Sequence, residues 1–146
     1  MISSDPLAET QPGRIVAWLG RQVTHALRTV DLSDSQYRML AFLAGGASAA
    51  TPMAGRLDLS RPSITALVDG LEARGHVERC TDETDRRRVR LSLTPAGEAA
   101  LVAADRVVND RLDQVLGHLP PVERERAAGC TRLWGKALLA IEQAPG

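Results

Sequence analysis

Apolar residues recur every three to four positions along most of the chain, which is the spacing of amphipathic helices. A first helix is expected over residues 14–30. A second starts at Ser33 and Gln36, which form a capping box, and ends at Gly45 and Gly46. In the last third of the chain, helices are expected over residues 95–117 and 121–143.

Two closely spaced helices are expected between these segments. Residues 51–57 have Thr51 as a cap and a proline in the first helical position, and a short turn follows at Asp58 and Leu59. A longer helix starts at Ser60 and runs to about Arg74. A short and a longer helix separated by a turn of about three residues form a helix-turn-helix.

The period of the pattern changes after Gly75. Residues 77–80 suit a short strand, and apolar residues alternate with polar ones over 88–93. A polar tip lies between them, so the pair predicts a β-wing. The expected fold is mainly α with a small β-wing, a winged helix-turn-helix in one domain over 13–146. The lobe that contains the helix-turn-helix and the wing spans about 34–93, and residues 1–12 are expected to form a flexible N-terminal arm.

Composition limits the classes of protein to which the chain can belong. The 146 residues are 44% hydrophobic and 3% aromatic, and the formal net charge is zero. Two cysteines, Cys80 and Cys130, are too few for a disulfide scaffold, and we expect buried, unreactive thiols in a reducing cytoplasm. No targeting segment or apolar run long enough to span a membrane is evident, so we expect a cytoplasmic protein without a membrane partner.

The longer helix of the helix-turn-helix suits the major groove of DNA. Its core-facing positions are Ile64, Leu67, Val68 and Leu71, while the opposite face carries small residues. Arg61 and Ser63 lie in the first turn, where backbone N–H groups favour phosphate, and Arg61 suits a guanine edge. Thr65 and Ala66 suit a thymine methyl group.

The wing offers a second DNA contact. Four arginines fall within five residues, at Arg86, Arg87, Arg88 and Arg90, and arginine at a hairpin tip suits a narrow minor groove. Asp85 beside them would repel phosphate, so we expect it to orient the arginines.

Residues 59–75, 82–87 and 91–97 together resemble the MarR family of bacterial regulators. The resemblance implies a homodimer that grips a pseudo-palindromic site and represses transcription until a small molecule or oxidation releases it. It also implies that Arg87 and Asp85 are the wing-tip pair and that Ser35 and Gln36 lie near phosphates. Gly70 departs from the family pattern, in which a larger polar side chain is common. The expected DNA-binding residues are Ser35, Gln36, Thr51, Ser60, Arg61, Pro62, Ser63, Thr65, Ala66, Asp85, Arg86, Arg87 and Arg88.

Long apolar stripes run along the helices expected over 14–30, 95–117 and 121–143. A second copy of the chain would bury them, so we expect a homodimer. An effector pocket between these helices and the DNA-binding lobe is implied by the resemblance. Its candidate lining suits a small aromatic or phenolic ligand and consists of Trp18, Gln22, His25, Tyr37 and Arg38.

Other functions remain as alternatives. The neutral net charge suits a winged helix that binds proteins, and the cysteines suit a thiol-based redox regulator. The histidines His25, His76 and His118 are scattered, so neither a metal site nor a cofactor is expected. No nucleophile or phosphate-loop motif is present, so we expect no enzyme activity.

Overall fold

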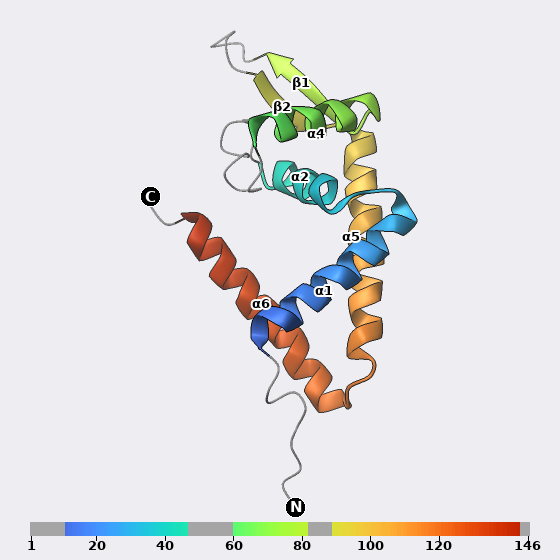
Figure 1. Ribbon diagram of the computed structural model, residues 1–146, viewed down its shortest axis with the longest axis vertical. Coiled ribbons are helices and arrows are strands. Elements are labelled where there is room, and N and C mark those ends of the chain that lie inside the picture. Colours follow the sequence, from blue (N-terminus) through green and yellow to red (C-terminus); the bar gives the residue numbers. More distant parts are fainter. Residues whose placement is uncertain (1–10, 47–59, 82–88, 144–146) are drawn as a thin grey trace, which may run out of the picture. The chain divides into compact units, whose positions relative to one another are not determined.

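The computed structural model describes residues 11–46, 60–81 and 89–143 and is mainly helical with a two-stranded wing, as predicted (Figure 1). The expected helix over 51–57 and the tip of the wing lie outside these residues. The chain divides into two compact units, residues 1–109 and 110–146. In chain order the elements are α1 (Pro12–Leu27), a 3-10 turn (Arg28–Val30), α2 (Asp34–Ala44), α4 (Arg61–Ala73), β1 (Val77–Thr81), β2 (Val89–Leu93), α5 (Pro95–Leu116) and α6 (Pro121–Gln143).

The capping box that opens α2 is confirmed. The Gln36 backbone N–H donates to Ser33 Oγ at 3.1 Å, and the Ser33 N–H donates to Gln36 Oε1 at 2.9 Å. Two N–H groups that the helix itself cannot satisfy thereby gain partners. Gly45 caps the other end, and Gly46 follows with a φ of 90°, a conformation that favours glycine.

Helix α4 begins and ends where the sequence predicts. Ser60 caps it by accepting the Ser63 N–H at 3.3 Å, and Gly75 follows the helix with a φ of 71°. Three of the four expected core positions, Ile64, Val68 and Leu71, are buried, whereas Leu67 is half-buried.

One core holds the first unit together. It draws on the end of α1, on α2, α4 and both strands, and on the first half of α5. A valine, leucine, isoleucine or methionine side chain contributes about 1.5–3 kcal/mol when fully buried. The core consists of Ala26, Leu27, Leu32, Met39, Leu40, Leu43, Ile64, Val68, Leu71, Val77, Leu91, Leu101, Ala104 and Val108.

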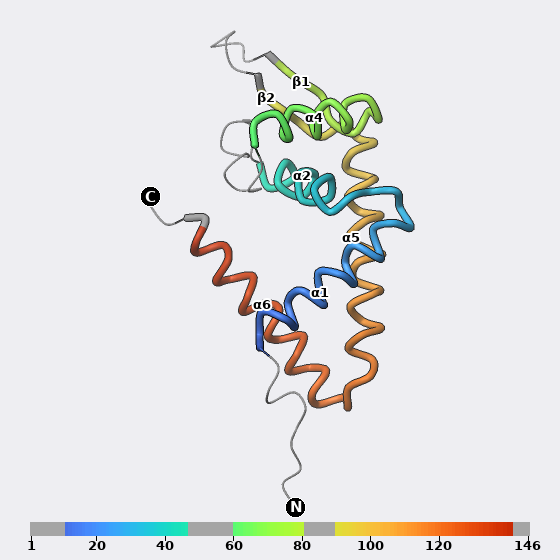
Figure 2. The backbone as a smooth tube through the Cα atoms, viewed as in Figure 1, coloured from blue at the N-terminus to red at the C-terminus, as the bar shows by residue number. Residues whose placement is uncertain are grey.

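The wing is joined to α5 by a tight junction. The strands pair antiparallel, with Val77 opposite Leu93 and Arg79 opposite Leu91, and the backbone runs from β2 straight into α5 (Figure 2). Thr94 donates its N–H to the His76 carbonyl at 3.1 Å and caps α5 by accepting the Gly97 N–H at 3.0 Å. The start of α5 is therefore fixed against the residue that precedes β1.

His76 lies partly buried at this junction. Its Nδ1 is buried and has no hydrogen-bond partner among the described residues. Burial lowers the pKa of His76, and the positive charge of Arg74 lowers it further.

The second unit contains the end of α5 and α6. No side chain of α6 is buried up to Ile141, the last one whose exposure the structure describes. Within this unit its apolar stripe is uncovered, with exposed fractions between 57% and 71% for Val122, Leu133, Trp134, Leu138, Leu139 and Ile141. No described helix is long and apolar enough to cross a membrane.

The expectation of buried thiols is wrong, since both cysteines are exposed. Cys130 belongs to the apolar stripe of α6, and that stripe is uncovered within the second unit. Cys80 follows Arg79 on β1, and alternation along the strand sends it to the face opposite buried Val77.

Candidate nucleic-acid interface

Helix α4 presents a row of small and polar side chains away from the core. Arg61, Pro62, Ser63, Thr65 and Ala66 are all exposed, as the sequence predicts for a helix that enters a DNA groove. The Thr65 hydroxyl donates to the Arg61 carbonyl at 3.1 Å. That hydrogen bond occupies the hydroxyl proton and leaves the methyl group as the part of Thr65 suited to a thymine.

The first turn of α4 is ordered by its own serines. Ser60 Oγ and Ser63 Oγ are 2.8 Å apart and share a hydrogen bond, in addition to the cap from Ser60 to the Ser63 N–H. With Arg61 between them, this turn combines hydroxyl groups, the helix N-terminus and a guanidinium. Each of these groups binds phosphate or base edges.

A hollow of about 450 Å³ separates α4 from the start of α2. It brings together two pairs of predicted DNA contacts, Ser35 and Gln36 from α2 with Ser63 and Ala66 from α4; Leu67 and Gly70 complete the lining. A Cβ at Gly70 would meet no atom within 4 Å, so the missing side chain leaves the hollow open. The Gln36 side-chain oxygen is engaged in the capping box, so its amide nitrogen is the group suited to phosphate.

The remaining predicted contacts, Thr51 and residues 85–88, lie outside the described residues. Of the four wing arginines, Arg90 is described, and it lies on β2 opposite Cys80.

One feature of α4 was missed by sequence reasoning. The guanidinium of Arg79 on β1 bonds to two carboxylates of α4, with Nη2 at 2.5 Å from Asp69 Oδ1 and Nη1 on Glu72 Oε2. We call these three residues the Arg79 bridge. The hydrogen bond to Asp69 is the main cause that raises the pKa of Arg79. The spacing of Asp69 and Glu72, three residues apart on a helix, was the available signal.

The chain is similar to known proteins in sequence and in fold. A model of the MarR family matches residues 30–88. A Thauera aromatica protein described as a transcriptional regulatory protein for the hcr operon is 31% identical over 119 residues, covering 80% of this chain and 70% of that protein. The chain belongs to the MarR family. It is therefore a DNA-binding transcription regulator and not an enzyme.

The chain is also similar to other transcription regulators. The HTH-type transcriptional regulator FarR of Neisseria gonorrhoeae is 32% identical over 90 residues, which are 61% of this chain and 62% of FarR. The repressor CouR, solved on a 23-mer DNA duplex, is 28% identical with a TM-score of 0.70 and coverage of 94% and 99%. Ligand-free MarR of E. coli has the same fold, with a TM-score of 0.73, 22% identity and coverage of 88% and 97%.

The five residues expected to line an effector pocket are spread over α1 and α2. Trp18 is 59% exposed, His25 and Arg38 are exposed, and Arg38 lies 4.0 Å from Asp34 in an ion pair. The hollow next to α4 contains none of the five, and neither does one of about 480 Å³ that Arg28 and Arg74 help to line. The pocket therefore stays a prediction.

Tyr37, one of those five, connects α2 to α5. Its hydroxyl donates to Asp105 Oδ1 at 2.7 Å, and both side chains are half-buried. Burial raises the pKa of Tyr37, and the hydrogen bond and negative charge of Asp105 raise it further. Tyr37 is thus a neutral donor to a carboxylate across two helices of the first unit.

Replacing Tyr37 by phenylalanine is expected to lower the free energy of unfolding by about 1 kcal/mol, because Asp105 loses its donor while still half-buried. Urea unfolding followed by circular dichroism measures the change. Asp105→Asn is the matched control, since an amide oxygen still accepts the bond and a smaller loss is expected. Wild-type stability in Tyr37→Phe would show that the bond contributes nothing.

Proposed function

We propose that this MarR-family protein is a homodimeric repressor that binds a pseudo-palindromic DNA site and is released by a small aromatic or phenolic ligand. The exposed row on α4, from Arg61 to Ala66, is the observation that carries the DNA-reading part. Small side chains let the helix approach the base edges, and the adjoining hollow supplies Ser35 and Gln36 for the phosphates beside it.

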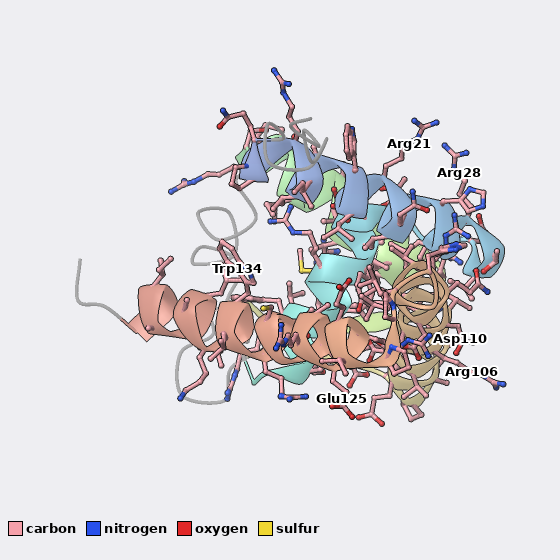
Figure 3. All side chains as sticks on the ribbon, turned by 90° about the horizontal axis from the view of Figure 1, so that it is seen from below. Arg21, Arg28, Arg106, Asp110, Glu125 and Trp134 are labelled. Atoms are coloured by element: carbon pink, nitrogen blue, oxygen red, sulfur yellow. The ribbon has the colours of Figure 1, made fainter. Side chains whose placement is uncertain are left out.

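Uncovered apolar surface supports the homodimer. On α6 the apolar stripe has no cover within its own unit, and Trp134 projects from that helix (Figure 3). On α1, Val16 and Trp18 are also more than half exposed. A second copy would remove both surfaces from water, and large exposed apolar patches are rare on monomeric proteins.

Selection of bound sequences from a pool of random DNA duplexes tests this proposal. A dimer with two helix-turn-helix lobes is expected to enrich an inverted repeat whose half-sites are centred about 10 base pairs apart. Sedimentation of the free protein should give the mass of two chains. Enrichment of a single asymmetric site, or of no sequence, would contradict the proposal.

The wing makes a separate prediction. Arg87→Ala is expected to weaken DNA binding about tenfold and to reduce the salt dependence by about one released ion per protomer, because a minor-groove guanidinium is lost. Fluorescence anisotropy at several salt concentrations measures both quantities. Arg106→Ala, which removes an exposed arginine of α5 (Figure 3), is the control. Unchanged affinity in Arg87→Ala would remove the wing from the proposal.

The ligand part rests on two aromatic side chains of the predicted pocket set, Trp18 of α1 and Tyr37 of α2. Trp18 is largely exposed, and Tyr37 is half-buried. Aromatic rings with a nearby guanidinium such as Arg38 suit a benzoate or a phenol. Titration of benzoate and phenol is expected to change tryptophan fluorescence and to release labelled DNA at the same concentration. A fluorescence change without release would leave only a binding site.

The exposed thiols favour one second candidate, release by oxidation. Cys80 lies on the outer face of the wing strand, with Sγ 3.8 Å from Ser92 Oγ. Thiol oxidation requires such access. If oxidation controls binding, peroxide should release DNA from the wild type but not from a variant with Cys80→Ser and Cys130→Ser.

A further inference from the structure

Two of the three charged side chains of α4 belong to the Arg79 bridge. Residues 61–73 contain two acids, Asp69 and Glu72, and one base, Arg61. The two carboxylates lie in the second half of α4, and both bond to Arg79. Without that guanidinium, the helix that approaches the DNA would present two unpaired negative charges.

The position of Arg79 follows from the strand. Val77 and Leu91 are buried, and strand pairing places Arg79 opposite Leu91, so all three lie on the face of the wing that packs against the core. Arg79 is the next residue on that face of β1 after Val77, at the edge of the core. There its forked guanidinium meets carboxylates one helical turn apart on α4, which it engages through separate nitrogen atoms.

The bridge is accessible enough to respond to DNA. The side chains of Arg79, Asp69 and Glu72 are 37%, 56% and 39% exposed. Charges at such a depth contribute little to stability, because water screens them. They still act on a polyanion that displaces that water, since repulsion between a carboxylate and phosphate grows as the local dielectric falls.

We propose that Arg79 is a positioning residue for DNA binding, which neutralises Asp69 and Glu72 and holds the wing strand against the reading helix without touching DNA itself. This inference rests on the proposed DNA-binding function of α4. The inference predicts that DNA binding is weakened by the charges of Asp69 and Glu72 when Arg79 no longer pairs with them. Replacing both carboxylates by amides should then restore the affinity for DNA.

Three variants test the inference by fluorescence anisotropy on the duplex recovered by selection. Arg79→Gln is expected to weaken binding about tenfold, within the range measured for residues that share an ion-pair network. Combining it with Asp69→Asn and Glu72→Gln should return affinity to within about threefold of wild type. Arg79→Lys keeps the charge but loses the forked guanidinium, so its affinity for DNA should lie between those of Arg79→Gln and the triple variant.

Controls separate this role from others. Arg106→Gln makes the same change in net charge on α5 and should bind like the wild type. Thermal unfolding should place every variant within a few degrees of the wild type, as expected for exposed pairs. If the triple variant binds as weakly as Arg79→Gln, Arg79 contacts DNA directly and the inference is wrong.

Two outcomes distinguish this inference from the proposed function. If the wild type binds and Arg79→Gln binds equally well, the bridge has no role and the proposed function stands. If the wild type binds no duplex at all, the proposed function fails, and the role of Arg79 fails with it.

Discussion

Replacing Gly97 by alanine is expected to lower the free energy of unfolding by about 3 kcal/mol or more. A Cβ at this position would lie 1.9 Å from the carbonyl oxygen of His76 and 2.8 Å from its carbonyl carbon. Both are backbone atoms, and the same carbonyl accepts the Thr94 N–H. The start of α5 and the strand entry would have to separate, so the wing junction opens.

Gly70→Ala is the matched control for that substitution. Gly70 also lies in a helix, but its Cβ would meet no atom within 4 Å. Alanine is the better helix former, so this variant should gain about 0.5–1 kcal/mol. Urea unfolding of both variants by circular dichroism gives the comparison. Wild-type stability in Gly97→Ala would contradict the close approach of α5 to His76.

Replacing Arg61 by alanine is expected to weaken DNA binding about a hundredfold while leaving the fold intact. Arg61 is exposed in the first turn of α4, so its loss removes no core contact. A well-placed arginine on a base pair contributes about 1–3 kcal/mol, and a dimer would lose two such contacts. Anisotropy titration on the selected duplex measures the loss.

Arg14→Ala controls for the loss of charge, because Arg14 is also exposed but lies on α1. It should bind the duplex like the wild type. Sequence selection adds a second readout, since Arg61→Ala should relax preference at one position of each half-site. Unchanged affinity and unchanged preference would mean that α4 is not the reading helix.

Local signals in the sequence predicted most of the fold. The cap at Ser33, the cap at Ser60 and the glycines after α2 and α4 mark helix ends within a few residues, so neighbouring positions suffice to place them. Alternation over residues 88–93 identified β2 for the same reason. The exposed row on α4 also followed from the sequence, because helical periodicity assigns one face to the core and the other to solvent.

Contacts between distant residues were not predictable in this way. The bond between Tyr37 and Asp105 joins residues 68 positions apart, and no local pattern relates them. The Arg79 bridge joins a strand to a helix, and its geometry depends on how the wing packs. The exposure of Cys130 was missed because a stripe on a helix shows which residues seek cover, and does not show whether the same chain provides it.

The most direct test of the central claim is a fluorescence-anisotropy titration of the protein with the DNA upstream of its own gene and with a scrambled duplex, at two salt concentrations. We expect tighter binding to the upstream DNA and a steep loss of affinity at the higher salt, because arginine contacts release ions from the phosphates. Equal and salt-insensitive binding to both duplexes, together with no enrichment in the selection from random DNA, would contradict a sequence-specific regulator.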